Sequence, residues 1–147
     1  MMEKIYIIGV GLIGGSLALD IKRLHPKCTI FGIDHNEEHL KEALSLNIIN
    51  ATATVNDIVN ADLVIVAIPV NVTVKQLPEI LDKVGNDTLV IDVGSTKEDI
   101  CEAVKNHPKR RNFLAMHPIA GTEFSGPSAA IHNLYKGKTN IICEVED

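Results

Sequence analysis

Short, almost wholly apolar runs alternate along the chain with longer stretches in which apolar residues recur every three or four positions. The first pattern predicts buried β-strands, and the second predicts amphipathic α-helices. Strands are predicted at residues 4–8, 29–34, 51–53, 63–68, 88–93, 112–116 and 140–145. Helices are predicted at residues 11–24, after Asn36 as an N-cap, and at 57–60, 72–84 and 96–105. Pro78 is expected to divide the helix at 72–84 in two.

Strands that alternate with helices predict right-handed crossovers, and therefore a mainly parallel sheet with helices on both faces. The run at 63–68 is apolar without alternation, which is typical of a central strand covered on both sides. A length of 147 residues suits one domain, so we assign residues 1–147 to a single doubly wound α/β unit. In such sheets ligands bind beyond the carboxyl ends of the strands.

Composition excludes several classes of protein. The chain is 46% hydrophobic with a net charge of −5, which argues against disorder, and it lacks the basic or aromatic-rich surface of a nucleic-acid binder. Its three cysteines are far apart and have no metal-ligand spacing, so we expect no metal and a reducing, cytoplasmic setting. No apolar run is long enough for a membrane span. Five of the six histidines lie in polar stretches and are expected to be solvated.

A GxGxxG motif directly follows the first predicted strand and opens the first predicted helix. The first glycine permits a tight turn, the second lets a diphosphate approach the backbone, and the third lets the helix pack on the sheet. The N–H groups at the start of the helix then bind the phosphates. The expected cofactor-binding residues here are Gly9, Gly11, Leu12, Ile13 and Gly14. A glycine-rich turn that binds nothing is the alternative.

Asp34 stands twenty residues after the last of these glycines, at the end of the second predicted strand. A carboxylate there accepts hydrogen bonds from ribose hydroxyls and repels a 2′-phosphate. The next residues are His35 and Asn36 rather than an arginine, so NAD is favoured over NADP. FAD is the main competitor, because its proteins use the same motif.

Three further strand ends carry candidate residues. Pro69 follows the strand at 63–68 and either borders a nicotinamide ring or only ends the strand. Gly94 and Ser95 follow the strand at 88–93, and we expect Gly94 to border the cofactor. Ser95 with Glu98 fits a capping box, which is compatible with a second role in hydrogen bonding to a ligand or a histidine.

His117 follows the strand at 112–116, and Pro118 excludes it from helical geometry. We therefore expect its imidazole on a turn at a carboxyl strand end. An imidazole there can accept a hydroxyl proton while a hydride leaves, as alcohol oxidation requires. The alternative is a histidine that only hydrogen-bonds the loop.

Three blocks of the chain resemble prephenate dehydrogenases, a family of oxidoreductases of tyrosine biosynthesis that includes arogenate and cyclohexadienyl dehydrogenases. They are GVGLIGGSLA at 9–18, DVGSTK at 92–97 and HPIAGTEFSG at 117–126. The blocks run in the family's order over nearly the whole chain, and the third is the most specific. The resemblance implies a Rossmann-type domain that binds NAD.

The resemblance also implies oxidative decarboxylation of prephenate to 4-hydroxyphenylpyruvate. The histidine that matches His117 accepts the proton of the ring hydroxyl, and the serine that matches Ser95 orients it. Thr122 and Glu123 match residues that border the substrate pocket. Another NAD-dependent dehydrogenase and a non-catalytic NAD-binding module remain alternative functions.

The family continues into a helical domain that forms the homodimer and supplies an arginine for a substrate carboxylate. Nothing in this chain matches that domain, and Arg110 and Arg111 precede the strand of His117, at its wrong end. We therefore expect NAD⁺ binding by this chain, poor turnover of prephenate alone, and a homodimer only with the second domain.

Overall fold

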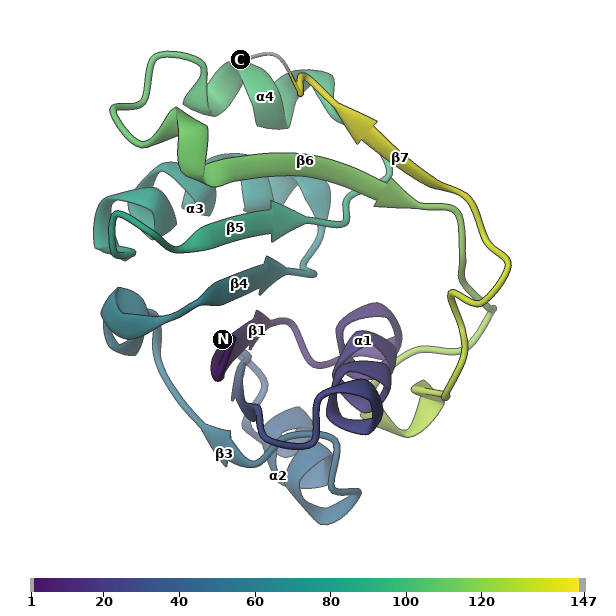
Figure 1. Ribbon diagram of the computed structural model, residues 1–147. Helices are drawn as coiled ribbons and strands as arrows, with labels where there is room; N and C mark the ends of the chain where they lie inside the picture. Colours follow the sequence, from purple (N-terminus) through teal and green to yellow (C-terminus); the bar gives the residue numbers. More distant parts are fainter. Residues whose placement is uncertain (1, 146–147) are drawn as a thin grey trace.

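One sheet forms the centre of the computed structural model, which describes residues 2–145 (Figure 1). Its strands have the order β3-β2-β1-β4-β5-β6-β7. Their bounds are β1 Lys4–Ile8, β2 Thr29–Ile33, β3 Ala51–Thr52, β4 Leu63–Val66, β5 Leu89–Asp92, β6 Phe113–Pro118 and β7 Asn140–Cys143. Neighbouring strands from β3 to β6 are parallel, whereas β7 pairs antiparallel with β6. The order reverses between β1 and β4, where a doubly wound sheet binds its ligand.

Helices cover both faces of this sheet and define two apolar clusters. The α-helices are α1 Leu12–Leu24, α2 Glu37–Ser45, α3 Val70–Lys83 and α4 Glu98–Val104, and the 3-10 helices are η1 Val55–Asn60, η2 Arg110–Asn112 and η3 Pro127–Ala129. Residues of α3 and α4 pack in one cluster with Ile8, Val64 and Val90. Residues of α1 and α2 pack in the other with Ile7 and Ile65. Successive strand residues face opposite sides, so the predicted doubly wound α/β fold is confirmed.

Two predictions for the helices were wrong. Pro78 lies inside one continuous helix, α3, instead of dividing it. The missing N–H removes one intrahelical bond, but Leu77, Ile80 and Leu81 on either side are buried in the core and hold the helix together. At α4, Ser95 forms no capping box, because the helix begins later, after Lys97, and has no side-chain cap. Asn36 does cap α2, by accepting from the N–H groups of Glu38 and His39.

A long segment connects β6 to the edge strand β7. It leaves the carboxyl end of β6, passes α1 and returns, as the yellow-green trace on the right of Figure 1 shows. Hydrogen bonds attach it to α1. The Ile131 N–H donates to Ser16 Oγ (3.0 Å), the Asn133 N–H donates to the Asp20 carboxylate, Arg23 donates to Asn133 Oδ1 (3.2 Å), and the Tyr135 hydroxyl donates to the carbonyl oxygen of Ile13 (2.7 Å). We call residues 119–139 the crossing segment. None of the helices within residues 2–145 has the length and apolarity that a membrane span requires.

Candidate functional site

A groove of about 350 Å³ lies beyond the carboxyl ends of β1, β2 and β4. This is the reversal point of the strand order, where a ligand is expected. Residues from four separate parts of the chain line it: Gly9, Gly11, Leu12, Ile13, Asp34, His35, His39, Ala67, Ile68, Pro69, Phe124, Ser125 and Gly126. The structure therefore brings together most of the residues that the sequence predicted to bind the cofactor.

The three glycines of the motif have different surroundings. Gly9 has a φ of +94°, and a Cβ there would collide with the carbonyl oxygen of Ala67. A Cβ on Gly14 would collide with the carbonyl oxygen of Gly9 and contact Ile7. At Gly11, by contrast, a Cβ would have no heavy atom within 4 Å other than those of Gly11 itself and its neighbours in the chain. The space above Gly11 fits a group that must approach the backbone closely, such as a diphosphate.

The first turn of α1 faces this space. Gly11 is the N-cap residue, not the first helical residue as predicted, and provides no side-chain cap. No side chain of the N-cap therefore competes for the first-turn N–H groups. They supply donors and the positive end of the helix dipole to an anion in the groove.

Asp34 lies where the sequence placed it, at the end of β2, with only 7% of its side chain exposed. One carboxylate oxygen accepts from the Val10 N–H (3.1 Å), and the other accepts from the Asn36 N–H (2.9 Å). These bonds fix the carboxylate against the glycine-rich loop and leave acceptor capacity for a further donor.

Two histidines expected to be solvated also line the groove. His35 Nδ1 lies 3.4 Å from one Asp34 oxygen, and its side chain is almost wholly exposed. His39 Nδ1 lies 3.8 Å from the other oxygen, and its side chain is about one-third exposed. The polar residues around His39 in the sequence did not predict that it lines the groove, because its position depends on how α2 packs beside the glycine-rich loop.

Sequence reasoning missed a buried ion pair at the end of β5. Asp92 is fully buried, and its Oδ2 accepts from Lys97 Nζ and from the Gly94 N–H (3.0 Å). Lys97 also donates to the carbonyl oxygen of Met116 (2.6 Å), while Asp92 Oδ1 accepts from the Met116 N–H (3.3 Å). The pair therefore ties the loop after β5 to β6, directly before His117. The sequence did contain a signal for this ion pair: Asp92 is an acidic residue at the end of an apolar strand, and Lys97 follows it five positions later.

His117 lies inside β6, opposite Ile141 of β7, rather than on the predicted turn. The antiparallel pairing with β7 extends the strand through Pro118, a partner that local sequence did not predict. Ser95 is exposed in the loop that follows β5, the parallel neighbour of β6. Both residues thus belong to the carboxyl ends of adjacent strands, but neither lines the groove.

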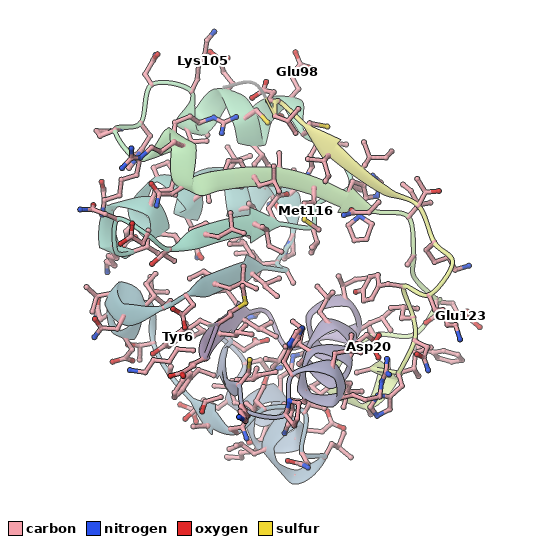
Figure 2. All side chains as sticks on the ribbon, viewed as in Figure 1. Tyr6, Asp20, Glu98, Lys105, Met116 and Glu123 are labelled. Atoms are coloured by element: carbon pink, nitrogen blue, oxygen red, sulfur yellow. The ribbon has the colours of Figure 1, made fainter. Side chains whose placement is uncertain are left out.

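Thr122 and Glu123, predicted to border the substrate, are exposed in the crossing segment. Figure 2 shows Glu123 at its outer edge, away from the strand ends. A small pocket of about 150 Å³ lies between β6 and α1 and is lined by Leu17, Met116, Pro118, Tyr135 and residues 138–140. Met116 faces this α1 side in Figure 2.

The cysteines are all free. Cys28 and Cys101 are buried, and Cys143 is half-buried. Burial, with the nearby Glu144 carboxylate, raises the pKa of Cys101 to about 11. Within residues 2–145, no group of three or more His, Cys, Asp or Glu side chains is arranged to hold a metal ion.

The chain is similar in sequence to known dehydrogenases. The model of the family "Prephenate dehydrogenase, nucleotide-binding domain" matches residues 17–147. The chain is 38% identical over 146 residues to a prephenate dehydrogenase of Bacillus subtilis, covering 97% of this chain and 39% of that protein. It is 31% identical over 138 residues to a cyclohexadienyl dehydrogenase of Zymomonas mobilis, covering 92% of this chain and 47% of that protein. The chain thus spans less than half the length of these relatives.

Solved structures of dehydrogenases share the fold of this chain. A prephenate dehydrogenase from Aquifex aeolicus, in complex with hydroxyphenyl propionate and NAD⁺, superposes with a TM-score of 0.84 at 32% identity, covering 99% of this chain and 52% of that one. A 3-hydroxyacyl-CoA dehydrogenase from Archaeoglobus fulgidus has a TM-score of 0.64 at 25% identity, covering 80% of this chain and 42% of that one.

Proposed function

The chain belongs to the prephenate dehydrogenase family of oxidoreductases, and on this premise we propose that it binds NAD and supplies the proton-accepting histidine for the oxidation of prephenate in tyrosine biosynthesis. The observation that carries the proposal is the groove at the reversal of the strand order, with open space above Gly11 and a fixed carboxylate at Asp34. His117 lies beyond it, at the carboxyl end of the same sheet.

The groove residues fit a dinucleotide. The first-turn amides of α1, at Leu12 and Ile13, face the position of the diphosphate, and Gly9 and Gly14 fix the loop that presents them. Asp34 accepts from the adenosine ribose hydroxyls and repels a 2′-phosphate, which favours NAD over NADP. Pro69 borders the groove as an apolar corner, and Gly94 shapes the neighbouring loop by donating to Asp92.

The chemistry needs a proton acceptor and accurate positioning. Bound NAD⁺ supplies the hydride acceptor. In the proposed reaction His117 accepts the proton of the ring hydroxyl as the hydride leaves the same carbon, and Ser95 hydrogen-bonds to orient the hydroxyl or the imidazole. The resulting ketone draws the electrons of the breaking bond to the ring carboxylate, which leaves as CO₂. Because the ring becomes aromatic, the protein mainly has to orient the reacting groups.

Recognition of the substrate carboxylates is not provided by the arginines nearest in sequence. Arg110 and Arg111 lie in η2, at the amino-terminal end of β6 and therefore at the opposite end from His117. The relatives are more than twice as long as the matched region. We therefore expect this chain to bind NAD⁺ but to oxidise prephenate poorly, with efficient turnover and the homodimer requiring the helical domain of the family.

Calorimetric titration with NAD⁺, NADP⁺ and FAD, followed by assays with prephenate and arogenate, tests the proposal. We expect the highest affinity for NAD⁺, weak or no turnover by this chain, and efficient turnover when it is joined to the helical domain of a relative. In that longer protein, His117→Asn should lower kcat about 10²- to 10⁴-fold and leave the affinity for NAD⁺ unchanged. Equal affinity for NAD⁺ and NADP⁺, or an unchanged kcat, would contradict the assignment.

A further inference from the structure

Phe124 is a large apolar side chain that the fold leaves 66% exposed. It lies in the crossing segment, more than a hundred residues after the glycine motif, yet it lines the same groove as Gly11 and Asp34. Its backbone conformation is defined, because the Phe124 N–H donates to Thr122 Oγ1 (3.2 Å). An exposed aromatic ring on the wall of a ligand groove is placed to be covered when the ligand binds.

The crossing segment holds Phe124 at this position. Beyond it, the Ile131 N–H donates to the fully buried Ser16, and the Tyr135 hydroxyl donates to the carbonyl oxygen of Ile13 in the first turn of α1. Before it, the Ile119 N–H donates to the carbonyl oxygen of Thr139, close to the start of β7. The crossing segment, which forms one side of the groove, is therefore attached to α1, whose first turn forms the other side. These bonds fix the two sides of the groove relative to each other.

Contacts next to Phe124 show which part of the groove it borders. A Cβ added to Gly126 would lie 3.9 Å from His39 Nε2, and His39 Nδ1 lies 3.8 Å from Asp34. The turn that carries Phe124 is thus beside the Asp34 end of the groove. Asp34 is the residue expected to bind the adenosine ribose, so the neighbouring wall belongs to the adenosine half of the ligand.

We propose that Phe124 is a cofactor-contacting residue that packs against the adenosine half of the bound dinucleotide. The inference rests on the proposed binding of NAD⁺. Ile68 and Pro69 contribute apolar surface to the groove from the loop after β4, and Phe124 contributes it from the crossing segment. Aromatic rings pack on nucleobases and sugars without needing specific hydrogen bonds, so this contact adds affinity, while Asp34 selects the ribose.

Binding of NAD⁺ and of ADP-ribose, which lacks the nicotinamide, tests the inference. Phe124→Ala should weaken both ligands by a similar factor, of about ten, as expected for loss of an aromatic contact with a base. Ile131→Ala is the matched control, because Ile131 is 46% exposed on the same segment but does not line the groove. It should leave both affinities unchanged, and neither variant should lower Tm.

Fluorescence gives a second readout, since the chain contains no tryptophan. Phe124→Trp should show a change in emission that saturates with ADP-ribose, whereas Ile131→Trp should show none. Unchanged affinities in Phe124→Ala would overturn the inference, and so would a loss confined to NAD⁺, which would place the ring beside the nicotinamide. If the unmodified chain binds neither ligand, the proposed function fails and this inference fails with it.

Discussion

Gly11 and Gly14 are three residues apart in one loop, yet they are required for different reasons. The added Cβ would enter open space at Gly11 and would collide with the backbone at Gly14. One glycine thus keeps room for a ligand, and the other keeps room for the protein itself. The residue type and spacing of the motif predicted both requirements, because each glycine of the motif corresponds to a particular backbone geometry.

We predict that Gly11→Ala and Gly14→Ala have separable effects. Gly11→Ala should leave Tm nearly unchanged and lower the affinity for NAD⁺ at least about tenfold, because its methyl group would occupy the place of the diphosphate. Gly14→Ala should lower the free energy of unfolding by about 1–3 kcal/mol, as overpacking does. Urea unfolding and calorimetry measure the two effects. Tight NAD⁺ binding by Gly11→Ala would contradict the placement of the diphosphate.

Asp34 is the second residue with a testable role in cofactor choice. Asp34→Asn removes the negative charge that opposes a 2′-phosphate, so the ratio of NADP⁺ affinity to NAD⁺ affinity should rise about tenfold. Because the carboxylate also accepts from Val10 and Asn36, Tm should be recorded in parallel. Glu37→Gln is the control, because it removes a carboxylate charge from an exposed side chain of α2 that does not line the groove, and it should leave the ratio nearly unchanged. An unchanged ratio in Asp34→Asn would show that another residue selects the cofactor.

At the scale of elements, the ends of β5 and β6 are joined by side chains as well as by the strand ladder. Lys97 bonds both to Asp92 of β5 and to the backbone of Met116 in β6. This arrangement explains why the predicted capping box is absent. The loop after β5 is drawn toward the buried carboxylate, and α4 then begins only at Glu98. The position of Ser95 is therefore set by an ion pair between residues on either side of it, both of which also bond to the backbone of Met116 in β6.

Removing one partner of this pair should destabilise the fold strongly. Lys97→Met leaves Asp92 buried without its cation, and we expect a loss of about 3–5 kcal/mol in the free energy of unfolding. The double variant Asp92→Asn/Lys97→Met should recover part of this loss, because no buried charge is left unpaired. Lys105→Met is the control, since Lys105 is an exposed lysine on the surface beside α4. A loss no larger than that of the control, measured by urea unfolding, would contradict a tightly coupled pair.

At the scale of the whole molecule, the protonated forms of Cys101 and Tyr135 contribute stability that is lost at high pH. Burial raises the pKa of Cys101 from 9.0 to about 11, and burial together with the Asp20 carboxylate raises the pKa of Tyr135 above its ordinary value. A group whose pKa is raised in the folded state stabilises the fold fully below its unfolded pKa. That contribution is lost as the pH rises toward the folded value.

The free energy of unfolding should therefore fall as the pH rises from 9.0 to about 11. Urea unfolding across this range measures the decline, and Cys101→Ala should make it shallower because the thiol no longer titrates. At neutral pH, Cys101 should react with iodoacetamide more slowly than the half-buried Cys143. A stability that does not change over this range would contradict the raised pKa values.

The sequence alone determined the alternation of strands and helices, the glycine loop, Asp34 and the position of His117 near a carboxyl strand end. These features follow from local periodicity and from residue types whose chemistry acts within a few positions. Tertiary structure decided the rest: the continuity of α3 through Pro78, the bonds from the Asp92–Lys97 pair to Met116 of β6, the pairing of β7 with His117, and the approach of Phe124 to the groove. Each of these depends on contacts between residues distant in the chain or on core packing that outweighs a local preference, and neither is expressed in the local pattern.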